Sequence, residues 1–171
     1  ESMTTVTESK SRGLVSWDRL LRLVVGALAV SLSLFHLYTG AFGVLEAYMQ
    51  RTIHLMTLLT ITFLTYPTSR RWSRQASSAV DIPLAAISLF IGIYLLAHHD
   101  RLVGREWYYG DVEPLDMILG VVMLPLLLEA ARRVVGLALP IIAIVFIGYG
   151  QFGNLLPDPF TIRTPPFHVF I

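Results

Sequence analysis

Residues 114–153 are the stretch that most restricts how this chain folds. They form two long apolar runs separated by one charged group, made of Glu129, Arg132 and Arg133. The core of a soluble protein does not need two such runs end to end. In a bilayer, the first run can form a helix that crosses the membrane and the second a helix that crosses back. On a helix, Glu129 lies three and four residues from the arginines, so the spacing predicts that its carboxylate meets a guanidinium.

The composition agrees with lipid as the main solvent. Charged residues make up 15% of the 171 residues, against about 25% in soluble domains. The absence of cysteine excludes disulfides, thiolate metal sites and cysteine nucleophiles. The sequence also lacks the motifs of nucleotide-binding proteins, zinc proteases and serine hydrolases. We therefore expect an all-α integral membrane protein that is not an enzyme, with no catalytic residue, cofactor, metal or nucleic-acid partner.

Hydropathy predicts a bundle of four to five transmembrane helices within residues 17–153. The expected spans are residues 20–42, 49–66, 82–97, 114–130 and 134–152. A polar segment, 1–16, precedes the bundle, and a proline-rich tail, 154–171, follows it. Because no apolar signal core precedes the first span, we expect that span to act as an uncleaved signal anchor.

The distribution of Lys and Arg predicts the orientation. A cytoplasmic N-terminus places nine basic residues inside and four outside, which is the bias that membrane insertion favours. The inside set is Lys10, Arg12, Arg19, Arg22, Arg70, Arg71, Arg74, Arg132 and Arg133, and the outside set is Arg51, Arg101, Arg105 and Arg163.

Three prolines and one aspartate carry local predictions. We expect Asp81 to cap the third helix, with Pro83 in its first turn. Pro125 and Pro140 are each expected to kink their helix, because proline removes a backbone hydrogen bond.

Small and polar residues form one stripe on the first span. They recur in steps of three and four, which is one face of a helix. Small residues permit close helix approach in lipid, so we expect this helix-packing stripe to face protein. Its members are Gly26, Ala29, Ser33, His36 and Gly40. For His36 an interhelical hydrogen bond is favoured over a proton relay, since no acidic partner lies deep in another span.

His98, His99 and Asp100 stand together in the loop after the third span. A polar loop at the membrane surface is favoured over a metal site, because adjacent residues seldom supply convergent ligands.

Two segments carry a resemblance to a known family. They are FHLYTGAFGVLEAYMQRTIHL, residues 35–55, and PLDMILGVVMLPLLLEAARRVVGLALPIIAIVFIGYGQFGNLLP, residues 114–157. Together they resemble the small-subunit, N-terminal region of membrane permeases of tripartite ATP-independent periplasmic (TRAP) transporters, and in particular the TAXI branch. The run LEAARRVVGLALP followed by GQFGNLLP is the most specific part.

The resemblance implies a small scaffold-type subunit in a bacterial or archaeal inner membrane. Such systems import small organic acids with an ion gradient and a periplasmic binding protein. The large permease subunit holds the substrate and the coupling ion, Na⁺ or H⁺, while the small subunit braces it among the membrane lipids. The resemblance leaves open whether the chain is a separate subunit or part of a fused permease.

If the chain is such a subunit, two groups of residues have expected roles. We expect Glu129, Arg132 and Arg133 to anchor the cytoplasmic edge. We expect an acidic and aromatic loop to contact the binding protein; its residues are Glu106, Trp107, Tyr108, Tyr109 and Asp111.

Two other functions remain open from the residues. One is a small membrane enzyme that uses His36, Glu46 and His54. The other is a free-standing homo-oligomeric channel, against which the scarcity of polar pore-lining positions argues.

Overall fold

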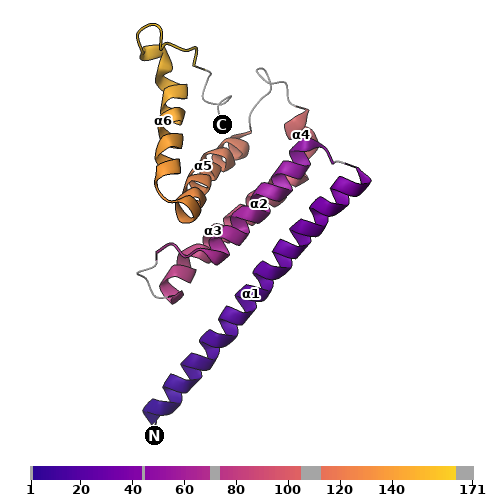
Figure 1. Ribbon diagram of the computed structural model, residues 1–171, viewed down its shortest axis with the longest axis vertical. Coiled ribbons are helices and arrows are strands. Elements are labelled where there is room, and N and C mark those ends of the chain that lie inside the picture. Colours follow the sequence, from indigo (N-terminus) through magenta and orange to yellow (C-terminus); the bar gives the residue numbers. More distant parts are fainter. Residues whose placement is uncertain (1, 44, 70–73, 105–112, 165–171) are drawn as a thin grey trace. The chain divides into compact units, whose positions relative to one another are not determined.

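The computed structural model describes residues 2–43, 45–69, 74–104 and 113–164, and within these ranges it contains helices and no strand. The elements in chain order are α1 (Ser2–Phe42), α2 (Ala47–Thr65), α3 (Arg74–Ala97), α4 (His99–Val103), α5 (Pro114–Val135), α6 (Ala138–Phe152) and the 3₁₀ helix η1 (Gly153–Leu155) (Figure 1). The chain divides into two compact units, residues 1–47 and 48–171.

The described part of the first unit contains a single helix, α1. Its segment Arg19–Phe42 is long and apolar enough to cross a membrane. The helix ends before Gly43, whose φ of +125° is a backbone conformation that L side chains rarely adopt. The sequence thus places a helix breaker directly after the apolar run, in agreement with the end expected at residue 42.

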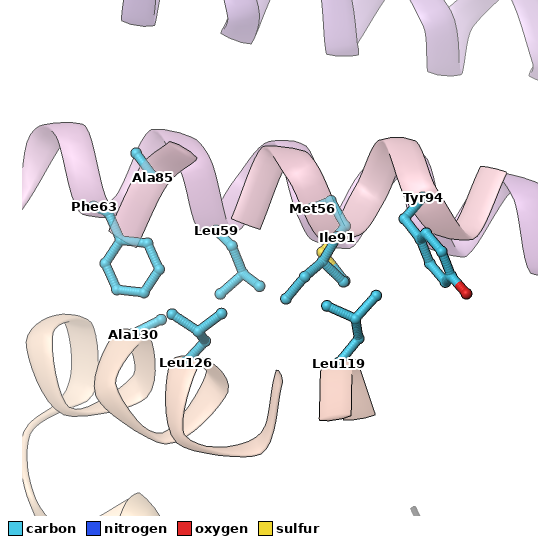
Figure 2. Packing of buried hydrophobic residues seen from close by; sticks show 9 residues of the cluster. All are labelled: Met56, Leu59, Phe63, Ala85, Ile91, Tyr94, Leu119, Leu126 and Ala130. Atoms are coloured by element: carbon cyan, nitrogen blue, oxygen red, sulfur yellow. The ribbon is translucent and has the colours of Figure 1, made fainter. Parts of the chain in front are cut away.

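The second unit is built on a core shared by α2, α3 and α5. The buried side chains of this core are Met56, Leu59, Phe63, Ala85, Ile91, Tyr94, Leu119, Leu126 and Ala130. Figure 2 shows the side chains of α2 and α3 directed toward those of α5. On α2 the buried positions follow helical spacing, from Thr52 through Met56 and Leu59 to Phe63. One face of α2 therefore packs inside the unit, although the helix carries several threonines.

Helices α2 and α3 approach each other closely at Gly92. A β-carbon added there would lie 2.8 Å from Cβ of Met56, closer than two carbon atoms normally pack. A residue without a side chain is thus needed at position 92. The close approach brings Ile91 and Met56 into the same core layer.

Helices α5 and α6 are joined by a tight turn (Figure 1). The turn is made by Gly136, whose φ is +93° and whose N–H donates to the Arg132 carbonyl at 3.1 Å. Helix α6 is apolar around most of its circumference, and Ile141, Val145 and Phe146 are exposed. A helix with this pattern is typical of a membrane segment whose surroundings are lipid or another chain.

The first part of the tail folds back over the end of α6. The Ile162 N–H donates to the Gly153 carbonyl at 3.2 Å, and the Tyr149 hydroxyl donates to the Phe160 carbonyl at 2.9 Å. A side chain at Gly153 would collide with Ile162. The expected proline-rich tail is therefore tied to the helix up to this point.

Among the described residues, four helical segments are long and apolar enough to cross a membrane. They are Arg19–Phe42, Ser77–Ala97, Pro114–Val135 and Ala138–Leu155. The expected span at 49–66 coincides with α2, which is not one of the four. Its threonines, together with Gln50, Arg51 and His54, lower its hydropathy, although 19 residues extend about 28 Å.

Three local expectations are wrong. Helix α3 begins at Arg74, so Asp81 and Pro83 lie inside the helix rather than at its start. The polar residues before Asp81 are helical because tertiary hydrogen bonds hold them, as described below. Pro140 lies in the first turn of α6, where a missing N–H removes no helical hydrogen bond and no kink is needed. Pro125 does lie inside its helix, α5.

Candidate functional site

The charged group in α5 is the centre of a larger polar network. Nε of Arg132 donates to Oε2 of Glu129 at 2.7 Å, and Nε of Arg133 donates to Oε1 at 2.8 Å. Glu129 thus contacts both arginines, as the helical spacing predicts. Because both contacts lie on one turn of one helix, they fix the directions in which the two guanidinium groups extend.

Arg133 connects α5 to the ends of two other helices. Its Nη1 donates to the Tyr66 carbonyl at 2.8 Å and to Oδ1 of Asp81 at 2.7 Å, and its Nη2 donates to the Thr68 hydroxyl at 2.7 Å. The guanidinium carbon also lies 4.9 Å from the centre of the Phe63 ring, within the range of a cation–π contact. One side chain therefore binds the segment that follows α2, the Asp81 position inside α3, and its own helix.

Asp81 and its neighbours complete the network. The Asp81 carboxylate accepts hydrogen bonds from the Thr68 hydroxyl at 2.6 Å and from the Ser77 hydroxyl at 2.8 Å. The Ser77 hydroxyl in turn accepts the Thr68 N–H at 3.1 Å. These bonds hold the first turns of α3, which are too polar to be predicted as part of a span. We call Thr68, Ser77, Asp81, Glu129, Arg132 and Arg133 the Arg133 network.

The Arg133–Asp81 pair at the centre of the Arg133 network is buried, and the network is balanced in charge. The Arg133 side chain is 1% exposed and that of Asp81 is 10% exposed. Two arginines face two carboxylates, so the formal charges cancel. Buried charges are tolerated when each is paired and hydrogen-bonded, and removal of one partner costs about 3–5 kcal/mol. The network therefore acts as a clamp, in which each charge depends on the others.

A second polar cluster lies at the other end of α3 and α5. Nη1 of Arg101 donates to Oδ2 of Asp116 at 2.8 Å, and its Nη2 donates to Oδ1 of Asp116 and to the Tyr94 hydroxyl, both at 2.9 Å. The Tyr94 hydroxyl donates to Oδ1 of Asp116 at 2.7 Å, and Glu113 lies 3.2 Å from Arg101. We call Tyr94, Arg101 and Asp116 the Asp116 cluster. The hydrogen bonds to Asp116 raise the pKa of the Arg101 guanidinium, so it stays charged.

A cavity opens beside the Asp116 cluster. Its volume is about 510 Å³, and its wall includes Tyr48, Thr52, Tyr94, Asp116 and Met123. These residues come from α2, α3 and α5, so the cavity lies within the second unit. The described residues contain no group of three or more His, Asp or Glu side chains arranged to hold a metal ion.

His98 and His99 lie beside the Asp116 cluster and bind different partners. Nδ1 of His98 lies 3.0 Å from the Tyr94 carbonyl, and Nδ1 of His99 lies 2.9 Å from Oδ1 of Asp100. The two rings thus make separate contacts, and His99 and Asp100 lie at the start of helix α4 rather than in the expected loop.

The residues of the helix-packing stripe lie on α1. The Ser33 hydroxyl donates to the Ala29 carbonyl at 2.9 Å, and the ring of His36 lies edge-on to that of Phe35 with centroids 5.3 Å apart. Because the described residues of the first unit contain no second helix, the packing role of Gly26 and Gly40 stays a prediction.

The remaining predicted residues are those of the enzyme hypothesis and of the loop expected to contact a binding protein. Glu46 lies in the first unit and His54 lies in the second, where its side chain is exposed. The predicted contact loop for a binding protein, Glu106 to Asp111, falls outside the described residues.

Sequence reasoning missed the aspartate partners of both arginine sites. Asp81 and Arg133 are 52 residues apart, and Arg101 and Asp116 are 15 residues apart. One signal was present: an ionisable residue inside an apolar helix is costly and implies a partner. Applied to Asp81 and Asp116, that rule predicts a cation for each, although it does not say which one.

Comparison of the chain with models of protein families, with curated proteins and with solved structures found no match.

Proposed function

We propose that this chain is the small, scaffold-type membrane subunit of a TRAP secondary transporter. In this proposal it acts beside a large permease subunit, which imports small organic acids with an ion gradient, and beside a periplasmic binding protein. The observation that carries the proposal is the resemblance of residues 35–55 and 114–157 to the small-subunit region of such permeases.

The Arg133 network supports a bracing role. A transporter that moves one part against another needs a second part that keeps its shape. Arg133 joins three helices through one enclosed guanidinium, and the buried core between them adds apolar contacts. Interlocked polar groups of this kind allow few alternative arrangements. The α2–α3–α5 bundle has the construction of a rigid support.

The bundle also supports a fifth crossing by α2. The beginning of α2 lines the cavity together with Asp116, which lies near the beginning of α5. The carbonyl of Tyr66, just after α2, binds Arg133 near the end of α5. Helix α2 thus runs along the whole length of α5, so it crosses the bilayer if α5 does. Its polar residues are tolerated because α3 and α5 cover one of its faces.

The proposed orientation rests on the distribution of Lys and Arg, which favours a cytoplasmic N-terminus. With the N-terminus in the cytoplasm, five crossings place the Arg133 network at the cytoplasmic edge and the Asp116 cluster at the outer edge. Arginines at a cytoplasmic edge also attract anionic lipid headgroups.

Reconstitution tests the proposed function. The tagged chain is purified from its native membrane, and a co-purifying multi-span subunit is identified and reconstituted in vesicles with the secreted binding protein. Uptake of an organic acid is expected only when all three proteins and an ion gradient are present. A chain that carries solute across vesicles unaided would make it a channel and overturn the proposal.

A paired substitution tests the bracing step. Arg133→Met is expected to reduce uptake by weakening assembly with the large subunit, whereas Arg163→Met, at an exposed tail position, is not. Glu46→Ala and His54→Ala are also expected to leave uptake intact. Loss of uptake in either of these two, with assembly unchanged, would favour the enzyme hypothesis.

A further inference from the structure

The cavity beside the Asp116 cluster has two chemically different ends. One end carries Arg51, Thr52 and Asp116, and the rest of the wall is mostly apolar, with Leu55 and Met123 among its residues. Its volume of about 510 Å³ falls in the range of pockets that enclose small ligands. The cavity therefore has the polarity of an amphiphile, with one charged end and one hydrocarbon end.

The depth of the cavity follows from helix geometry. Asp116 and Met123 are seven residues apart on α5, a distance of about 10 Å along the helix. Asp116 lies in the first turn of a membrane-spanning segment and Met123 lies nearer its middle. The polar end thus lies at headgroup level, and the apolar end extends into the hydrocarbon region.

The charges at the polar end are not equivalent. The Asp116 carboxylate is 9% exposed and is already bound by Tyr94 and Arg101. Arg51 is exposed at the cavity wall and makes no hydrogen bond or ion pair with any residue that the structure describes. The cation is thus available to a ligand, whereas the anion is neutralised within the protein.

We propose that this cavity binds an anionic amphiphile. Its hydrocarbon chain occupies the apolar part between Leu55, Met56 and Met123, and its carboxylate or phosphate pairs with Arg51. Thr52 lies beside Arg51 on the wall and supplies a hydroxyl at the same level. The ligand chemistry is shared by free fatty acids and by anionic phospholipids. This site is independent of the proposed transport function.

Photolabelling of the purified full chain tests the site. The chain is freed of lipid in a neutral detergent and exposed to three probes with the same photoactivatable hydrocarbon chain: a fatty acid, its methyl ester and a phosphatidic acid. Labelled peptides are identified by mass spectrometry. Labelling by at least one anionic probe is expected on the segments that contain Met56, Leu119 and Met123. Labelling by only the fatty acid or only the phosphatidic acid identifies the source of the ligand.

Charge variants test the headgroup contact. Arg51→Glu is expected to weaken binding of the anionic probes about fivefold, the upper size of one exposed ion pair, whereas Arg51→Lys retains most of it. Arg163→Glu is the matched control, because Arg163 is exposed and is not part of the cavity. Equal labelling by the methyl ester and the acid, or no effect of Arg51→Glu, would overturn the assignment.

A filling variant tests the cavity itself. Gly120 lines the wall, and Gly120→Leu places a side chain there. This change is expected to abolish labelling while Arg51 is present, with helix content by circular dichroism as the check on folding. Undiminished labelling of a folded Gly120→Leu protein would place the hydrocarbon chain elsewhere and reject the site. If Gly120→Leu does not fold, the Arg51 variants decide alone.

Discussion

Arg133 and Arg101 each bind an aspartate across the same bundle, but in opposite settings. The Arg133 side chain is 1% exposed and donates from all three of its nitrogens. The Arg101 side chain is 34% exposed, and its Nε has no hydrogen-bond partner among the described residues. The first arginine is enclosed by protein, and the second stands where the bundle opens into a cavity.

This difference shows what the same ion pair does in two environments. In an enclosed site each charge relies on its protein partner, because water cannot replace that partner. In a partly open site, water and a second carboxylate such as Glu113 share the cation. The Arg133 network, which we call the closed end of the bundle, therefore holds the helices together. The Asp116 cluster, which we call the open end, leaves space for a ligand.

Breaking the closed end should give the largest effect. Arg133→Met leaves the Asp81 carboxylate and the Tyr66 carbonyl without a buried cation, so the free energy of unfolding is expected to fall by about 3–5 kcal/mol. The measurement is chemical unfolding in mild detergent, followed by circular dichroism. Arg163→Met serves as the control at an exposed position. Equal stability of the two variants would show that Arg133 does not clamp the bundle.

A double variant separates charge from packing in the same experiment. Asp81→Leu combined with Arg133→Met removes both members of the buried pair and replaces them with apolar side chains. The loss is expected to be smaller than the sum of the two single losses by about 1–3 kcal/mol, since neither charge is stranded. Simple additivity would contradict a direct interaction between the two side chains.

Breaking the open end should cost less. Asp116→Asn keeps the size of the side chain but removes the charge that faces Arg101. Because Arg101 is one-third exposed and also lies near Glu113, its charge regains water and a second carboxylate. The fall in melting temperature is expected to be less than about half of that for Arg133→Met. An equal fall would remove the distinction between the two ends.

Apolar patterning located the apolar segments because lipid-facing residues reveal a span directly, although α5 continues to Val135 and α6 begins only at Ala138, past the expected bounds of 130 and 134. The end of α1 at Phe42 and the start of α5 at Pro114 lie where the sequence placed them, since Gly43 and Pro114 mark those boundaries locally. The beginning of α3 was missed for the opposite reason. Its first turns are polar and are held by the hydrogen bonds of Ser77 and Asp81, which no local sequence pattern predicts.

The contacts of the candidate sites also fall into two kinds: those that local sequence predicts and those that depend on how the helices pack. The contacts of Glu129 with its arginines were predictable because i to i+3 and i+4 neighbours always meet on a helix. The pairing of Arg133 with Asp81 was not, because it depends on how two helices distant in sequence lie against each other. The cavity also depends on that packing. Its lining residues share no sequence motif, and only the charged residues Arg51 and Asp116 stand out among them in the sequence.

The smallest effect is expected from Arg132, the neighbour of Arg133. Its side chain is 37% exposed, and it binds Glu129 and the Thr68 carbonyl while Arg133 continues to hold the carboxylates. Arg132→Ala is therefore expected to lower the free energy of unfolding by about 1 kcal/mol or less, as for other partly exposed pairs. The same unfolding titration measures it beside Arg133→Met. The two substitutions remove the same formal charge and differ chiefly in the burial of the arginine. An equal loss of unfolding free energy in Arg132→Ala and Arg133→Met would therefore mean that charge balance, rather than burial, determines the strength of the closed end.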